Sequence, residues 1–292
     1  MKNQLFNGSG VAIVTPFNEQ GVNYEKLTEL IEYHIANKTD AIIICGTTGE
    51  ASTMHDEEHL AVIRHAVKIA DKRIPVIAGT GSNYTDHCIE LSQEAEKAGV
   101  DGLLIVTPYY NKATKNGLLK HYTMVAASVK VPIILYNVPG RTGVTIPVDV
   151  LKELAKIDNI VAIKEATGNI SYVADIAANV PDLAIYSGND DMIVPVMALG
   201  GIGVISVVAN IMPKETHDIC EYYISGKVEE SRKLQLRMLN LINTLFIEVN
   251  PVPIKTAMNL LGMNVGKLRM PLCEMEDGNL SKLEAALADM GL

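Results

Sequence analysis

Eight short apolar runs, separated by longer amphipathic segments, are the feature of this sequence that most constrains its fold. The apolar runs cover residues 11–15, 41–45, 75–79, 102–107, 132–136, 160–164, 183–187 and 203–207. The amphipathic segments cover residues 24–37, 56–70, 85–98, 117–128, 148–156 and 170–179. Continuously apolar runs are typical of parallel strands buried on both faces. The alternation predicts an α/β protein with a (β/α)8 TIM barrel, and a doubly wound open sheet is the alternative.

The chain after residue 225 has a different pattern. Residues 226–292 contain no strand-like run, and they predict two or three helices packed onto the barrel. We therefore divide the chain into a catalytic barrel, residues 1–225, and a C-terminal helical domain, residues 226–292.

One uncharged segment, residues 192–213, is long enough to resemble a membrane span. Pro195 and three glycines interrupt it, and β-branched residues fill its second half. These breaks favour a buried helix, a glycine turn and a buried strand. We also find no signal-peptide pattern, so we expect a cytoplasmic protein without membrane attachment.

The charge and the cysteine positions argue against a nucleic-acid-binding protein and against a zinc or thiol-redox protein. The formal net charge is -9, and no cluster of Lys and Arg offers a nucleic-acid site. The cysteines are too far apart for zinc or redox spacing, which fits a reducing compartment. They are Cys45, Cys88, Cys220 and Cys273, and Cys45 lies in an apolar run that predicts a core position.

Polar residues gather where several predicted strands end, and barrel active sites lie at those ends. Lys164 ends the apolar run 160–164, so its amine should lie beside an apolar wall. Burial disfavours the charged form of an amine, and a neutral amine is what Schiff-base chemistry needs. A lysine paired with Glu165, or reaching to solvent, is the plainer alternative. The surrounding polar cluster favours catalysis.

Four further residues belong to this cluster. Tyr136 ends the neighbouring strand, where its phenol could relay protons or simply pack. Thr47 and Thr48 lie in a glycine-flanked turn that could bind a carboxylate or be a plain turn. Arg141, in a loop after the fifth strand, suits bidentate binding of a carboxylate, although it could be a surface arginine.

Motifs for metals and nucleotides are incomplete. His55 and His59 are spaced like a metalloprotease pair, but the glutamate is not at the required position. Residues 79–81 lack the third glycine of a dinucleotide fingerprint, and no Walker A loop occurs. We therefore predict no metal and no cofactor.

Three motifs carry a resemblance to a known family. They are residues 46–50 (GTTGE), 136–143 (YNVPGRTG) and 163–168 (IKEATG). Together, in this order and at barrel spacing, they resemble the 4-hydroxy-tetrahydrodipicolinate synthases, also called dihydrodipicolinate synthases, of the pyruvate-dependent class I aldolase superfamily. The resemblance spans nearly the whole chain.

The resemblance implies a carbon–oxygen lyase that needs no cofactor. This family condenses pyruvate with L-aspartate 4-semialdehyde through a lysine Schiff base. The product is 4-hydroxy-tetrahydrodipicolinate, on the diaminopimelate route to lysine. In this sequence Lys164 matches the Schiff-base lysine. Tyr136, Thr47 and Tyr110 match the proton relay, with Tyr110 supplied by a neighbouring subunit.

Binding roles follow from the same resemblance. Thr47 and Thr48 match the groups that hold the pyruvate carboxylate, and Arg141 matches the group that holds the semialdehyde carboxylate. Gly188 and Ile205 match residues whose carbonyls face the site. The resemblance also implies a homo-oligomer, a homotetramer built as a dimer of dimers, while the residues themselves leave dimer and tetramer open.

Two other functions compete with this one. An N-acetylneuraminate lyase or a keto-deoxy sugar acid aldolase would share the lysine and the GTTGE-type loop, but those enzymes usually lack the arginine of the 141–143 turn. A catalytically inactive barrel used for binding is the other alternative. The joint presence of Lys164, Tyr136, Thr47, Tyr110 and Arg141 argues against it.

Many members of the family carry a lysine feedback site at the dimer interface. The matching positions here are Ala51, Ser52, Met54, Asp56, His59, Asn83, His87 and Tyr109. Asn83 and Tyr109 are retained. The lysine-sensitive pattern has a glutamate where this chain has His87, and a histidine where it has Asp56. We therefore expect free lysine to inhibit weakly or not at all.

Overall fold

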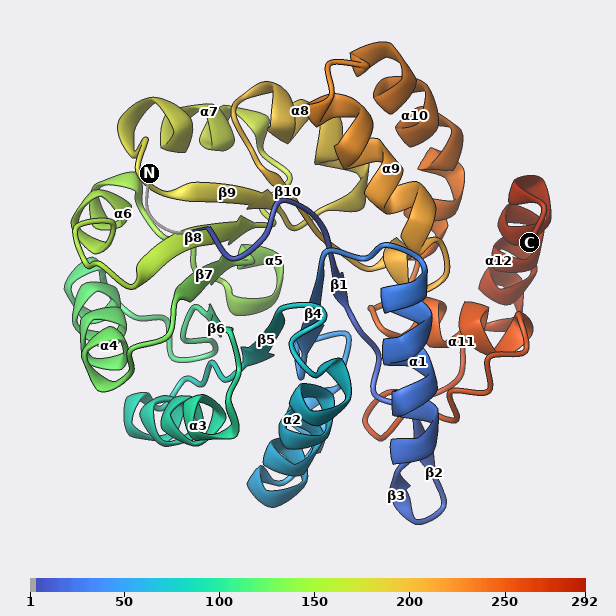
Figure 1. Ribbon diagram of the computed structural model, residues 1–292, viewed down its shortest axis with the longest axis horizontal. Helices are drawn as coiled ribbons and strands as arrows, with labels where there is room; N and C mark the ends of the chain where they lie inside the picture. Colours follow the sequence, from blue (N-terminus) through green and yellow to red (C-terminus); the bar gives the residue numbers. More distant parts are fainter. Residues whose placement is uncertain (1–3) are drawn as a thin grey trace.

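The computed structural model describes residues 4–292, and within them eight parallel strands close into a barrel (Figure 1). The strands are β1 (Gly8–Ala12), β4 (Ala41–Ile44), β5 (Val76–Gly79), β6 (Gly102–Val106), β7 (Ile133–Asn137), β8 (Ile160–Glu165), β9 (Ala184–Ser187) and β10 (Gly203–Ser206). β1 pairs with β10 on one side and with β4 on the other. This closure confirms the predicted barrel and excludes the open sheet.

Helices surround the strands (Figure 1). Those of the barrel are α1 (Tyr24–Ala36), α2 (Asp56–Ala70), α3 (Thr85–Ala98), α4 (Lys115–Ser128), α6 (Val148–Leu154), α7 (Ile170–Asn179), α8 (Ile193–Ala198) and α9 (Pro213–Ile224). α1 shows why they form where predicted. Asn23 caps it by accepting a hydrogen bond from the Lys26 amide, and Leu27, Leu30 and Ile31 form its buried stripe.

The first strand begins three residues earlier than predicted. β1 covers Gly8–Ala12 instead of residues 11–15, because its first half is built from small residues that an apolar pattern does not detect. A Cβ atom added to Gly10 would lie 2.6 Å from Ile43 and 2.7 Å from Phe6. Small residues are therefore required where the first strand meets the packed interior.

A short hairpin and a one-turn helix were not predicted. β2 (Phe17–Asn18) and β3 (Gly21–Val22) form an antiparallel hairpin outside the barrel. α5 (Pro139–Thr142) is a single helical turn, so Arg141 lies in a helix and not in the loop that we expected. Pro139 at its first position supplies the backbone angle that starts a helix.

The interior of the barrel is filled with side chains toward the amino ends of the strands. Phe6 stacks on Tyr186 with ring centroids 4.4 Å apart, and the Tyr186 hydroxyl donates to the Phe6 carbonyl. Ile43, Ile134 and Ile205 belong to the same buried cluster. This packing closes one end of the barrel, so only the carboxyl ends of the strands are left for a site.

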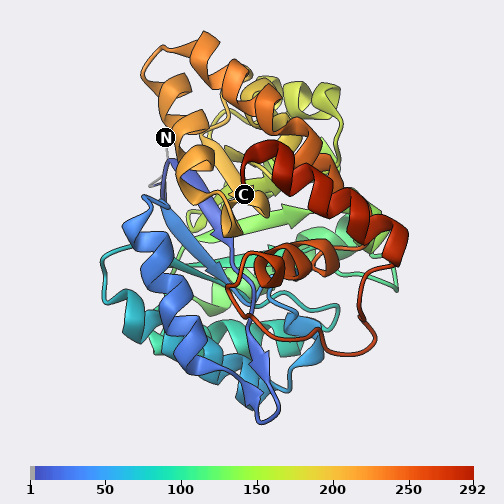
Figure 2. The same cartoon turned by 90° about the vertical axis from the view of Figure 1, so that its right-hand side faces the viewer.

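The C-terminal extension contains α10 (Val228–Thr244), α11 (Val252–Leu260) and α12 (Asp277–Met290). α10 packs against α9 and α12, and α11 also contacts α12 (Figure 2). The three helices agree with the predicted pattern, whereas the division at residue 225 stays a prediction. The uncharged segment 192–213 forms α8 and β10, as expected. Across residues 4–292, no helix is long and apolar enough to cross a membrane.

Candidate active site

A cavity of about 520 Å³ lies at the carboxyl ends of the barrel strands. Six predicted site residues line it together: Thr47, Thr48, Tyr136, Arg141, Lys164 and Gly188. A larger cavity, about 830 Å³, lies between α11 and the segment before α12. The predicted catalytic groups do not line that larger cavity, so the smaller one is the candidate active site.

Lys164 lies on β8 directly beside Tyr136 of β7, in the register that pairs the two residues. Its side chain is 6% exposed. Its Nζ lies 4.4 Å from the centroid of the Tyr136 ring and makes no hydrogen bond or ion pair with any residue from 4 to 292. The amine is therefore buried, faces a cavity and is available to a ligand.

Glu165 does not neutralise Lys164. Successive strand residues point to opposite faces of the sheet, so Glu165 points away from the barrel interior. Its Oε1 accepts hydrogen bonds from Asn137 Nδ2 at 3.2 Å and from the Thr167 amide at 2.8 Å. Burial raises the pKa of the Glu165 carboxyl. The plainer interpretation of Lys164, a lysine paired with its neighbour, is therefore wrong.

The two threonines of the 46–50 turn differ in exposure. Thr47 is exposed and lines the cavity, whereas Thr48 is 2% exposed. The Thr48 hydroxyl accepts a hydrogen bond from Asn250 Nδ2 at 3.0 Å. Arg141 donates from Nη2 to the carbonyl oxygen of the same Asn250 at 3.1 Å. One residue of the extension thus holds two of the predicted binding groups.

Two predicted residues lie outside the cavity lining. Ile205 is fully buried in the barrel interior, on the strand next to the cavity. Tyr110 is 90% exposed and has a left-handed φ of 73°. Since bulky residues rarely adopt that conformation, its backbone is held in a strained position with the ring in solvent. The structure does not bring Tyr110 to Lys164 of its own chain.

Asn250 and its neighbours were not predicted as part of the site. Residues 246–250 line the cavity although they belong to the extension. Asn250 is buried, and its Oδ1 has no hydrogen-bond partner within residues 4–292. The sequence offered a weak signal, because a polar residue before two prolines interrupts the helical pattern there.

Asp190 was also missed. It follows the 187–189 strand end and is 2% exposed. Its Oδ2 accepts from the amides of Val207 and Val208 at 3.0 and 2.9 Å. Burial raises the pKa of Asp190, and hydrogen bonds from the Ser206 side chain and from the Val208 and Val207 amides oppose that rise. Through these two amide hydrogen bonds Asp190 holds the residues that directly follow β10.

Four of the positions matched to a feedback site form two hydrogen-bonded pairs. His87 Nε2 lies 3.0 Å from both carboxylate oxygens of Asp56. Asn83 Nδ2 donates to the Tyr109 carbonyl at 3.2 Å. His59 is buried, with its ring nitrogen 2.9 Å from the Gly79 carbonyl. Ala51 and Ser52 lie in η1 (Ala51–Thr53).

No metal centre is visible among the described residues. Residues 4–292 contain no group of three or more His, Cys, Asp or Glu side chains that could hold a metal ion. The four cysteines are free, and Cys45 is buried as expected.

A closed parallel barrel, whose buried Lys164 at the carboxyl end has no hydrogen bond or ion pair within residues 4–292, defines a barrel enzyme of the aldolase type. Comparison with known proteins identifies the family within this class. Residues 5–290 match the model of the dihydrodipicolinate synthetase family, and this chain belongs to that family.

Individual relatives agree with this assignment. The 4-hydroxy-tetrahydrodipicolinate synthase of Acetivibrio thermocellus is 59% identical over 293 residues, covering 100% of both chains. The chloride-inhibited dihydrodipicolinate synthase of Acinetobacter baumannii complexed with pyruvate superposes with a TM-score of 0.95 at 45% identity, covering 98% of this chain and 99% of the other. The lysine-bound dihydrodipicolinate synthase of Cyanidioschyzon merolae superposes with a TM-score of 0.96 at 37% identity. The match covers 99% of this chain and 100% of the other.

Proposed function

We propose that this chain is a lyase that condenses pyruvate with L-aspartate 4-semialdehyde to form 4-hydroxy-tetrahydrodipicolinate, on the diaminopimelate route to lysine. Membership of the dihydrodipicolinate synthetase family supports this function. The single structural observation that carries it is the buried Lys164 amine, which faces the cavity without a hydrogen bond or ion pair to another residue of the 4–292 range.

The covalent route begins at Lys164. Nζ attacks the keto carbon of pyruvate, and loss of water gives an imine. The protonated imine draws electrons, so a methyl proton leaves and an enamine forms. The enamine carbon then attacks the aldehyde carbon of the semialdehyde. Finally, the amine of the semialdehyde closes the ring at the imine carbon and displaces the Lys164 amine.

Each of these steps moves a proton, and a relay of hydroxyls is the second part of the proposal. Tyr136 lies beside Lys164, and Thr47 lines the same cavity. We assign proton transfer to these two hydroxyls together with Tyr110 of a neighbouring subunit. The protonated imine supplies the polarisation that other enzymes take from a metal ion, so the route needs no cofactor.

Binding of the two carboxylates is assigned to different sides of the cavity. Thr47 and Thr48 would hold the pyruvate carboxylate, since they flank the cavity at the end of β4. Arg141 would hold the semialdehyde carboxylate, because its guanidinium can form charge-assisted hydrogen bonds to it. Gly188, which lines the cavity, and Ile205 would present their carbonyls to the reacting atoms.

Pyruvate with borohydride tests the central claim. Borohydride reduces the imine to a stable amine, so the mass of the intact protein should rise by one reduced three-carbon adduct. Peptide analysis should place that adduct on Lys164. An adduct on another lysine, or none, would overturn the proposal. Comparing aspartate semialdehyde with N-acetylmannosamine as the acceptor then separates the synthase from a sugar acid lyase.

Assembly into a homotetramer, as a dimer of dimers, belongs to the same proposal. Tyr110 is 90% exposed and held in a left-handed conformation, which suits a contact with a second copy better than open water. Disrupting the dimer should lower activity while the barrel stays folded. A fully active monomer would contradict this role of Tyr110. We also propose a cytoplasmic location, since all four cysteines are free.

Weak feedback by lysine completes the proposal. His87 and Asp56, which replace the residues of the lysine-sensitive pattern, are within hydrogen-bond distance of each other. Asp56 is therefore already partnered and is poorly placed to hold a ligand ammonium. Loss of one charge-assisted hydrogen bond is worth about 1.5–3 kcal/mol, or about tenfold or more in affinity. Titrating lysine into the assay tests this, and strong inhibition at submillimolar lysine would contradict it.

A further inference from the structure

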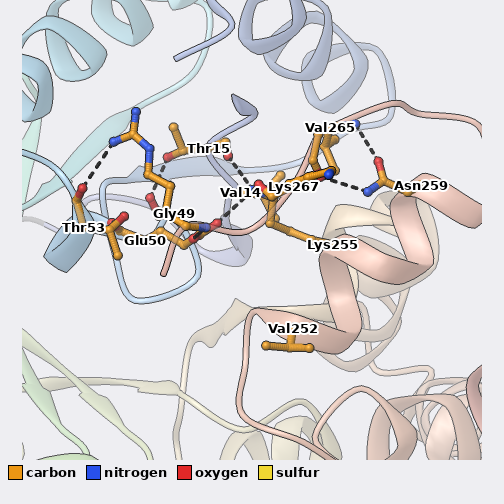
Figure 3. Close-up of polar contacts among 12 residues, drawn as sticks. Val14, Thr15, Gly49, Glu50, Thr53, Val252, Lys255, Asn259, Val265 and Lys267 are labelled. Atoms are coloured by element: carbon orange, nitrogen blue, oxygen red, sulfur yellow. Dashed lines mark hydrogen bonds and ion pairs between the residues drawn. The ribbon is translucent and has the colours of Figure 1, made fainter. Parts of the chain in front are cut away.

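A fully buried ion pair joins the 46–50 turn to the C-terminal extension. Lys255 lies on α11, and its side chain is 1% exposed. Its Nζ donates to Glu50 Oε1 at 2.8 Å, and to the carbonyl oxygens of Thr15 at 3.1 Å and Lys267 at 2.9 Å. Figure 3 shows Lys255 reaching from α11 toward Glu50 and Thr15. Each hydrogen of the ammonium thus has an acceptor.

Glu50 is held as completely as its partner. Its side chain is 0% exposed, and its second carboxylate oxygen accepts from the Arg269 amide at 2.9 Å. Its φ of 53° is left-handed, so the contacts around it must stabilise an unfavourable backbone. Next to it, the Gly49 carbonyl accepts from the Thr15 hydroxyl at 2.7 Å. The end of the turn is therefore fixed by its surroundings.

The same stretch of the extension holds the turn at a second point. Asn250 donates to Thr48, and Lys255 donates to Glu50. Both donors belong to the stretch that begins at the cavity wall and enters α11. The two ends of this stretch therefore bind the two ends of the Thr48–Gly49–Glu50 sequence.

We propose that Glu50 and Lys255 are a positioning pair that sets the carboxylate-binding turn of the active site relative to the wall formed by the extension. Neither side chain lines the active-site cavity, so the pair acts through Thr47 and Thr48. A buried ion pair is a poor source of stability compared with apolar residues of the same size. Its contribution here is the geometry of the turn. The inference rests on the proposed binding of pyruvate by that turn.

Substitution of Lys255 by methionine tests the inference. The measured quantity is the pyruvate concentration that gives half-maximal borohydride labelling of Lys164. Displacement of a binding group by about 1 Å can lower rates by about a hundredfold. We expect Lys255→Met to raise the half-saturating concentration by roughly tenfold to a hundredfold, while labelling at saturating pyruvate is retained. A fall in maximal labelling with unchanged half-saturation would overturn the inference.

Arg269→Met is the matched control. The Arg269 guanidinium lies 4.0 Å from the Phe17 ring, and Lys255 Nζ lies 4.5 Å from the same ring. The Arg269 guanidinium donates hydrogen bonds to Glu58 and to the Thr53 carbonyl. Of the Arg269 donors, Glu50 accepts only from the backbone amide, which the substitution retains. This variant removes a neighbouring cation and should leave the pyruvate concentration for half-maximal labelling unchanged. A rise equal to that of Lys255→Met would overturn the inference.

The single variant leaves the Glu50 carboxylate buried and unpaired, which can prevent folding. The double variant Glu50→Gln, Lys255→Met removes both charges and then serves as the test. A folded double variant with raised half-saturation supports the positioning role, whereas a wild-type value overturns it. Absence of labelling in the wild-type protein is a different result, because it contradicts the proposed function itself.

Discussion

Two buried lysines of this chain lie in opposite environments. Lys164 is 6% exposed at the barrel mouth, and its Nζ has no hydrogen bond or ion pair within residues 4–292. Lys255 is 1% exposed at the junction with the extension, and its Nζ donates to a carboxylate and two carbonyl oxygens. Both ammonium groups also lie over an aromatic ring, Tyr136 for one and Phe17 for the other.

The difference separates a reactive group from a structural one. A nucleophilic amine must be able to lose its proton and approach a carbonyl, so partners that hold the ammonium would oppose reaction. Lys255 has those partners. Burial lowers its pKa, but the Glu50 carboxylate opposes that shift. Burial alone therefore does not identify a catalytic lysine, and the number of its partners is more informative.

Substituting methionine for Lys164 and for Lys255 in turn should give the largest difference, one variant losing turnover and the other losing stability. Lys164→Met should lower turnover on the order of 10⁶-fold, the scale of removing a covalent nucleophile, with little loss of stability. Lys255→Met should instead lower the free energy of unfolding by about 3–5 kcal/mol, because it leaves Glu50 unpaired. Steady-state kinetics and denaturant unfolding of both variants measure this. Equal loss of stability in the two would remove the contrast.

Tyr136→Phe isolates the proton-transfer part of the barrel mouth. The ring beside Lys164 is retained and only the hydroxyl is lost, so the fold should be unchanged. General acid–base groups contribute about 10²–10⁴-fold, and turnover should fall by that amount. Labelling of Lys164 by pyruvate and borohydride serves as the control for binding. Near-normal turnover would exclude Tyr136 from the relay.

Arg141→Ala should have a smaller and selective effect. A charged hydrogen bond to a carboxylate is worth about 1.5–3 kcal/mol, so the KM for the semialdehyde should rise about tenfold or more. The KM for pyruvate should change less, because Thr47 and Thr48 are assigned to its carboxylate. If only the KM for pyruvate rises, the assignment of Arg141 to the semialdehyde carboxylate is wrong.

The smallest expected effect concerns another partnered side chain, His217, at the amino end of the barrel. His217 Nδ1 lies 2.9 Å from Asp40 Oδ2, which also accepts from the Ser9 amide of β1 at 2.7 Å. The hydrogen bond to Asp40 raises the pKa of His217 above its usual 6.5. The pair therefore stabilises the fold fully below pH 6.5, and this contribution is lost as pH rises through the raised pKa.

Melting temperatures of the wild type and of His217→Gln, followed across that pH range, measure this contribution. The difference between the two proteins should shrink as the pH rises. A difference that grows with pH would show that the imidazole is held neutral in the folded protein.

Local sequence patterns were sufficient to predict most of the strands and the position of Lys164 at a strand end. The run that ends at Lys164 predicts a buried strand because parallel strands need apolar residues on both faces. It also places the amine at the carboxyl end, where barrel sites lie. Tyr136 could be placed beside it from strand order alone. By contrast, Gly8–Ala12 was misplaced, since its small residues are explained only by the side chains that pack on them.

The sequence by itself determined the alternation of strands and helices and the residues at the strand ends, because both follow from local periodicity and short motifs. Tertiary structure alone decided which distant residues complete the site. Asn250 meets Thr48 across 202 positions of the chain, and Lys255 meets Glu50 across 205. Such contacts exist only after the barrel closes and the extension packs on it, so no local pattern contains them.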